Sequence, residues 1–126
     1  MFKSVHHIAI ICSNYEVSKN FYVNKLGFKI LRETYREKRQ SFKLDLKQNE
    51  VQIELFTFPN SPERLTEPES LGFRHIAFGV ENIKSVIFEL EEKGIEFEPI
   101  RVDERTGKKY TFFKDPDGLP IEIYEL

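Results

Sequence analysis

The sequence predicts an α+β fold in which two βαβββ modules form a curved mixed sheet. The main observation is an internal repeat at an offset of 68 positions: residues 7–10 return as 75–78, and residues 53–56 return as 121–124. A second observation is that each copy follows its opening strand with an Asn-capped helix. Repeats of this kind indicate a duplicated structural unit.

The first copy covers about residues 1–58. Residues 5–12 are rich in β-branched side chains and stop at Ser13-Asn14, which is typical of a strand that ends at a helix cap. A helix is expected over residues 15–26, closed by Gly27. Three further strands are expected, and they cover residues 28–33, 41–46 and 50–58.

The second copy covers about residues 73–126 and follows a Pro-, Ser- and Glu-rich linker at residues 59–72. A strand is expected over residues 73–80, and Asn82 should cap a helix with an apolar stripe. The last three strands are expected at residues 96–102, 110–114 and 119–124, with an Asp-Pro-Asp-Gly turn at 115–118. The 126 residues are therefore interpreted as a single domain made of two repeats.

Composition narrows the class of protein. A net charge of −2 and a pI near 6.0 argue against a nucleic-acid partner. No apolar run approaches the roughly 18 residues of a membrane span, and the first residues lack the apolar core of a signal peptide. The single cysteine, Cys12, excludes an intrachain disulfide. We expect a cytoplasmic protein.

Strand alternation predicts a metal site. His7 and Glu54 in the first copy, and His75 and Glu122 in the second, should project from the face opposite the apolar residues, on the concave side of the sheet. Two carboxylates facing two imidazoles are costly to bury without a cation. Such a set of nitrogen and oxygen donors suits one divalent ion per site: nickel, cobalt or zinc foremost, with iron or manganese as alternatives.

The residues resemble the vicinal oxygen chelate superfamily, which includes glyoxalase I, bleomycin-resistance proteins and extradiol dioxygenases. The resemblance rests on the paired modules, the His-Ile-Ala words at 7–9 and 75–77, and the final segment at 115–122. The order His7, Glu54, His75, Glu122 looks like that of bacterial glyoxalase I, whereas bleomycin-binding members lack these ligands.

This resemblance implies a lyase of the lactoylglutathione type, which isomerises a thiohemiacetal through a metal-stabilised enediolate. Glu122 would be the catalytic base, with Glu54 as its symmetric second. The resemblance also implies a homodimer, in which the four ligands come either from one chain or from both subunits.

Departures from glyoxalase I leave the thiol and the substrate open. Ile11 stands where that family carries an Arg for glutathione, and Asn60 is displaced from the position after the first Glu. The alternatives are another metalloenzyme of the superfamily (a dioxygenase, epimerase or thiol transferase) or a resistance protein that sequesters a small molecule. Cationic candidates for an anionic substrate are Arg36, Arg39, Arg101, Arg105, Lys108 and Lys109.

Overall fold

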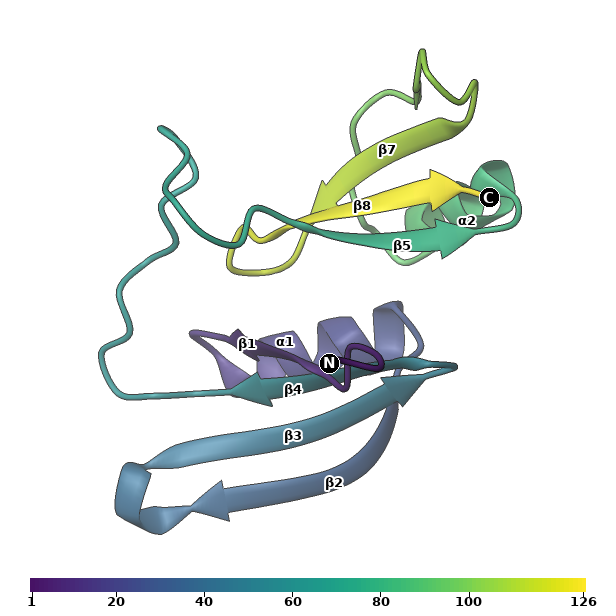
Figure 1. Ribbon diagram of the computed structural model, residues 1–126. Coiled ribbons are helices and arrows are strands. Elements are labelled where there is room, and N and C mark those ends of the chain that lie inside the picture. Colours follow the sequence, from purple (N-terminus) through teal and green to yellow (C-terminus); the bar gives the residue numbers. More distant parts are fainter. The chain divides into compact units, whose positions relative to one another are not determined.

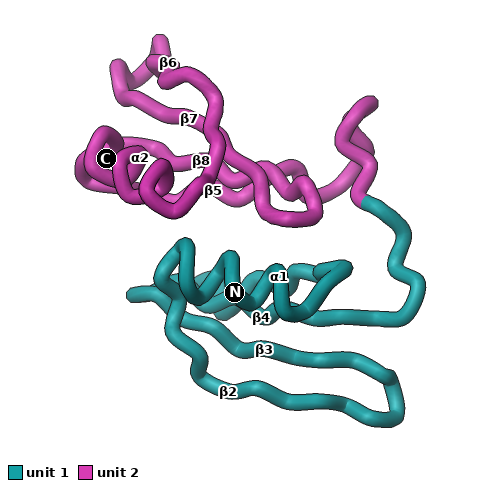
Figure 2. The backbone as a smooth tube through the Cα atoms, turned by 180° about the vertical axis from the view of Figure 1, so that it is seen from behind, with its two compact units in different colours: residues 1–63 teal, residues 64–126 magenta.

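The computed structural model describes all residues, 1–126. The chain divides into two compact units, residues 1–63 and 64–126, so the boundary falls inside the Pro-rich segment 59–72 (Figure 2). Each unit carries one four-stranded mixed sheet, and hydrogen-bonded strand pairing stays within each unit. The α+β class predicted from the sequence is confirmed. No helix is both long enough and apolar enough to cross a membrane.

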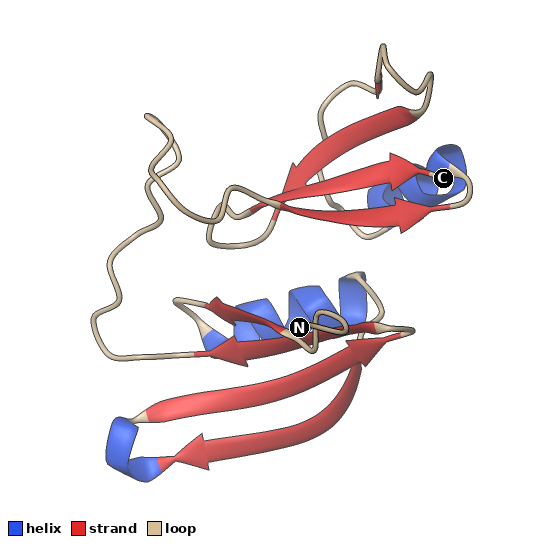
Figure 3. Ribbon diagram, viewed as in Figure 1, coloured by secondary structure: helices blue, strands red, loops and turns tan.

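The first unit forms a sheet of strand order β1-β4-β3-β2, in which β1 and β4 are parallel and the other neighbours antiparallel (Figure 1). A helical segment follows β1 and packs on one face of the sheet (Figure 3). In chain order the elements are β1 (Ile8–Ile11), α1 (Tyr15–Lys19), the π-helix η1 (Asn20–Lys25), β2 (Lys29–Arg36), the 3-10 turn η2 (Glu37–Arg39), β3 (Ser41–Gln48) and β4 (Val51–Phe56).

Two local features differ from the predicted boundaries. The first strand begins at Ile8 and not at residue 5, because β4 pairs with β1 only over Ile8–Ile11. The expected single α-helix continues as a π-helix, in which the Leu26 N–H donates to the Phe21 carbonyl at 2.9 Å. Gly27 then ends the helix with a φ of +82°, as its position in the sequence predicts.

The core of the first unit lies between the sheet and this helical segment. Alternation along β3 and β4 places Leu44, Leu46, Ile53 and Leu55 on the covered face, all of them fully buried. Burying each of these side chains stabilises the fold by about 1.5–3 kcal/mol. The opposite face of the same two strands is therefore left for polar residues.

The second unit repeats this plan with strand order β5-β8-β7-β6, where β5 and β8 are parallel. Its helix is α-helical throughout, and Ile83, Ile87 and Leu90 form the buried stripe that the sequence predicts. The elements are β5 (Ile76–Val80), α2 (Ile83–Glu92), β6 (Arg101–Val102), β7 (Lys109–Lys114) and β8 (Pro120–Glu125).

The strand expected over residues 96–102 is reduced to two paired residues. β6 pairs with β7 only through Arg101 and Val102, and Phe97 forms one isolated bridge with Phe113. Pro99 lies between these two pairings, and a proline has no backbone N–H to extend a ladder. The prediction of a full strand here was wrong for this reason.

The repeat is preserved in the strand register. Ala9 lies opposite Glu54, and Ala77 lies opposite Glu122, at the predicted offset of 68. The inner strands shift by one residue, however: Asp45 faces Glu54, while Phe112 faces Glu122. As a result Tyr110 takes the place of Lys43 and not of Phe42, which the constant offset had predicted.

Candidate functional site

In the first unit, His7 and Glu54 form a pair. His7 immediately precedes β1, and Glu54 lies on β4 beside Ala9. Parallel pairing of these strands brings His7 Nε2 to 3.5 Å from Glu54 Oε2. The Glu54 side chain is only 12% exposed and the His7 side chain 39%. A carboxylate so far removed from water needs a cation or a hydrogen-bond donor beside it.

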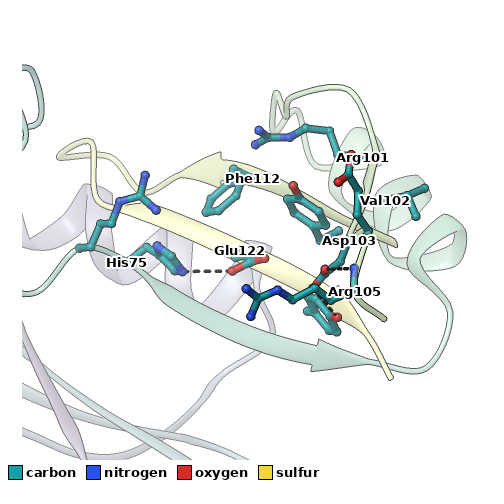
Figure 4. A pocket seen from close by; sticks show the side chains of 11 residues that line it. His75, Arg101, Val102, Asp103, Arg105, Phe112 and Glu122 are labelled. Atoms are coloured by element: carbon teal, nitrogen blue, oxygen red, sulfur yellow. Dashed lines mark hydrogen bonds and ion pairs between the residues drawn. The ribbon is translucent and has the colours of Figure 1, made fainter. Parts of the chain in front are cut away.

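In the second unit, His75 and Glu122 form the equivalent pair. The distance from His75 Nε2 to Glu122 Oε2 is 3.0 Å, with side-chain exposures of 25% and 14% (Figure 4). The His75 ring stands edge-on to Phe112, at 5.2 Å between ring centroids. The imidazole therefore packs against an aromatic ring while its Nε2 faces the Glu122 carboxylate.

Within each pair, the distance between Nε2 and Oε2 is that expected for two adjacent ligands of a metal ion. Two donor atoms each about 2.1 Å from an ion lie about 3.0 Å apart at a right angle and about 3.4 Å apart at a tetrahedral angle. The pairs at 3.5 Å and 3.0 Å span this range. Neither unit alone brings together three or more His, Cys, Asp or Glu side chains in a group able to hold a metal. The joint use of all four residues stays a prediction.

Lys43 and Asp45 join the pair in the first unit, and our sequence analysis missed both. The Lys43 ammonium lies 3.4 Å from Glu54 Oε1 and 3.6 Å from Asp45 Oδ1. Strand alternation could have predicted their position, because residues 43 and 45 alternate with the buried Leu44 and Leu46 and therefore lie on the polar face of β3. Glu54 is therefore held between an imidazole and an ammonium group.

Aromatic residues surround the pair in the second unit. Phe112 occupies the position that Asp45 has in the first unit. Tyr110 stacks with Tyr124 at 6.3 Å between ring centroids. Together with His75 and Glu122 they border a pocket of about 830 Å³. The remaining lining residues are Arg74, Arg101, Val102, Asp103, Glu104 and Arg105. The two units thus offer different chemistry around equivalent pairs.

The turn between β6 and β7 is tied to the strand that carries Glu122. Tyr124 Oη donates to Asp103 Oδ2 at 3.0 Å and is also hydrogen-bonded to Thr106. The Arg105 backbone N–H donates to Asp103 Oδ1 at 2.9 Å. This N–H first, and then the Tyr124 hydroxyl, lower the pKa of Asp103 below its ordinary value. The carboxylate thereby fixes the conformation of the turn.

The cationic side chains named as candidates for binding an anionic substrate lie in different parts of the structure. Of those that the sequence analysis named, Arg101 and Arg105 line the pocket, and Arg74 is an addition that it missed. The Arg36 guanidinium lies over the Phe56 ring in the first unit, at 4.9 Å from the centroid. Arg39, Lys108 and Lys109 lie outside the pocket lining.

The fold and the twin His–Glu pairs define a class of paired βαβββ proteins with potential metal ligands on equivalent strands. A model of the glyoxalase/bleomycin resistance protein/dioxygenase superfamily matches residues 4–123, and the chain belongs to this superfamily. The family that the sequence resembles is thereby confirmed.

Individual relatives support the same placement. The chain is 61% identical over 126 residues to the uncharacterized protein YwkD of Bacillus subtilis, covering 99% of this chain and 98% of that one. It is 33% identical to Glyoxylase I 4 of Arabidopsis thaliana, over 95% of this chain and 69% of that protein. The crystal structure of a glyoxalase family protein from Enterococcus faecalis is 56% identical, with a TM-score of 0.94 and 98% of each chain covered.

Proposed function

We propose that the protein is a metal-dependent enzyme of the glyoxalase I type, which isomerises a thiohemiacetal to the thioester of a 2-hydroxy acid. One observation carries the proposal: each unit holds a His and a Glu at equivalent positions, with Nε2 and Oε2 at 3.5 Å and 3.0 Å. Similarity to Glyoxylase I 4 of Arabidopsis thaliana supports the same chemistry.

His7, Glu54, His75 and Glu122 would hold the ion, within one chain or across a homodimer. The donor set fits nickel, cobalt or zinc, with iron or manganese as alternatives. A bound divalent ion would polarise the oxygens of the substrate and stabilise the negative charge that develops on them. We expect a cytoplasmic enzyme with a small-molecule substrate.

Glu122 is the proposed base. Its side chain is 14% exposed, borders the pocket and has His75 Nε2 as neighbour. In the isomerisation it would take the proton from the carbon that bears the hydroxyl group and return it to the adjacent carbon, so no other reactant is consumed. Glu54, whose carboxylate also faces Lys43, is the symmetric alternative and the less available base.

The choice of thiol remains a separate question within the proposal. The position occupied by an Arg in glyoxalase I is Ile11 here, and its side chain is exposed. An isoleucine offers no charge to the carboxylate of glutathione. We therefore propose the isomerase chemistry without assigning glutathione as the thiol.

Bound-metal content tests the proposal directly. Elemental mass spectrometry of untagged wild-type protein, reconstituted with nickel, cobalt or zinc, should give about one ion per site. His7→Ala, Glu54→Gln, His75→Ala and Glu122→Gln should each lower the metal content. Glu50→Gln is the matched control, because this exposed carboxylate lies in the turn between β3 and β4 and is not one of the four ligands.

Two results would overturn the proposal. Absence of metal from reconstituted wild-type protein would remove the basis for the chemistry and favour ligand sequestration. Full metal content in Glu54→Gln would point to a three-ligand enzyme of another kind. If metal binds, thiohemiacetal turnover per bound ion, followed by NMR in D₂O, should stop in Glu122→Gln, since that variant lacks the base even where it retains metal.

A further inference from the structure

Arg105 differs from the other two arginines that line the pocket of the second unit. Arg74 pairs with Glu69 at 2.5 Å, and Arg101 pairs with Glu98 at 2.9 Å. The Arg105 guanidinium lines the same pocket and forms no ion pair. Its five N–H donors are therefore available to a ligand.

The turn that carries Arg105 is held by several hydrogen bonds. The Asp103 N–H donates to the Lys108 carbonyl at 2.8 Å, and the Gly107 N–H donates to the Asp103 carbonyl at 2.7 Å. The Asp103 carboxylate accepts the Arg105 N–H at 2.9 Å and the Tyr124 hydroxyl at 3.0 Å. Tyr124 lies two residues after Glu122 on the same strand, so it fixes the turn relative to the proposed base.

The direction of the side chain completes the arrangement. In Figure 4 the guanidinium of Arg105 reaches from this turn back toward Glu122 and His75. Glu122 already has His75 Nε2 at 3.0 Å as its partner. A charged, unpaired guanidinium directed at the reacting end of a pocket is suited to a group on the ligand itself.

We propose that Arg105 determines substrate specificity by binding an oxyanion of the substrate, a carboxylate or a phosphate, while the reacting carbon lies at His75 and Glu122. Asp103 and Tyr124 act as positioning residues. The proposal deepens the function proposed above and rests on it. A guanidinium presents parallel donors that match both oxyanions with two hydrogen bonds.

The two acidic residues beside Arg105 differ in how far they can offset its positive charge. Asp103 is engaged by the turn and by Tyr124. Glu104 also lines the pocket and opposes an anion. Its replacement by glutamine should therefore tighten anion binding, whereas Arg105→Gln should weaken it.

The test is a titration of the full-length, zinc-reconstituted protein with inorganic phosphate and, separately, with succinate. The backbone amide signals of residues 103–108, which every variant retains, are followed by ¹H–¹⁵N NMR, together with the Arg105 side-chain Nε–H where arginine is present. We expect a saturable shift with at least one of the two anions, and the comparison identifies which oxyanion is preferred. Arg105→Gln should weaken that binding by about tenfold, as expected for a lost charge-assisted pair.

Arg39→Gln is the matched control, because Arg39 is an exposed arginine of the first unit that lies outside the pocket. Tyr124→Phe tests positioning: it should lower anion affinity and broaden the Arg105 Nε–H signal, with unchanged metal content. Equal anion affinity in wild type and Arg105→Gln would overturn the proposal. Loss of metal in the ligand variants, with no effect of Arg105→Gln, would leave the proposed function standing and refute this inference alone.

Discussion

Replacing Lys43 with methionine should tighten the binding of a divalent ion. The Lys43 ammonium lies 3.4 Å from Glu54 Oε1 and 3.6 Å from Asp45 Oδ1. An ion bound by Glu54 must compete with this ammonium for the same carboxylate. Methionine keeps most of the side-chain length and removes the charge.

The structure gives a magnitude for this competition. At 3.4 Å and an effective dielectric constant of about 20, Coulomb's law gives a ceiling of about 5 kcal/mol. Solvent screening and side-chain entropy reduce the net value of such pairs to at most about 1 kcal/mol. Because the Glu54 side chain is 12% exposed and that of Lys43 31%, we use the upper value of about 1 kcal/mol for this pair. The dissociation constant should therefore fall by about fivefold.

Competition with a chromophoric chelator for zinc measures this change. Lys47→Met is the control, since Lys47 lies on the same strand, is exposed and forms no ion pair. Unchanged or weaker zinc binding in Lys43→Met would refute the competition. Equal tightening in both variants would assign the effect to net charge and not to the contact with Glu54.

Three further predictions concern stability and pH. Ile121→Ala empties a fully buried position and should destabilise the protein by about 3 kcal/mol in urea denaturation. Asn82→Ala removes the cap that accepts the Ser85 N–H at 3.1 Å and should cost about 1 kcal/mol in the same assay. The lowered pKa of Asp103 means that its bonds stabilise the turn above its ordinary pKa of about 3.8 and are lost as pH falls through the lowered value. The protection factor of the Arg105 amide, which corrects for the intrinsic pH dependence of exchange, should therefore stay constant from pH 7 to about pH 4 and fall only below it, and a fall already near pH 6 would contradict this.

Local sequence patterns predicted the repeated helices and strands and the face of the sheet to which each side chain points. Asn14 and Asn82 cap equivalent helices, with acceptor distances of 3.1 Å in both. Such caps depend on residues only three positions apart, so the sequence reveals them. Alternation likewise predicted that Ile53 points into the core and Glu54 to the other face, because successive strand residues point to opposite faces.

The register of the inner strands could not be predicted in this way. A constant offset of 68 would have placed Phe42 and Tyr110 at the same position, yet Tyr110 corresponds to Lys43. Hydrogen bonds between distant strands and the intervening turns set this register. It decides that Asp45 stands beside Glu54 while Phe112 stands beside Glu122.

The sequence by itself determined the class of fold, the two modules and the four candidate ligands, since all of these follow from periodicity and repetition along the chain. Only the tertiary structure brought Lys43 to Glu54 and tied the Arg105 turn to Tyr124. These contacts join residues 11 and 21 positions apart on different elements. Their formation depends on the strand register and the turn geometry, which local patterns do not encode.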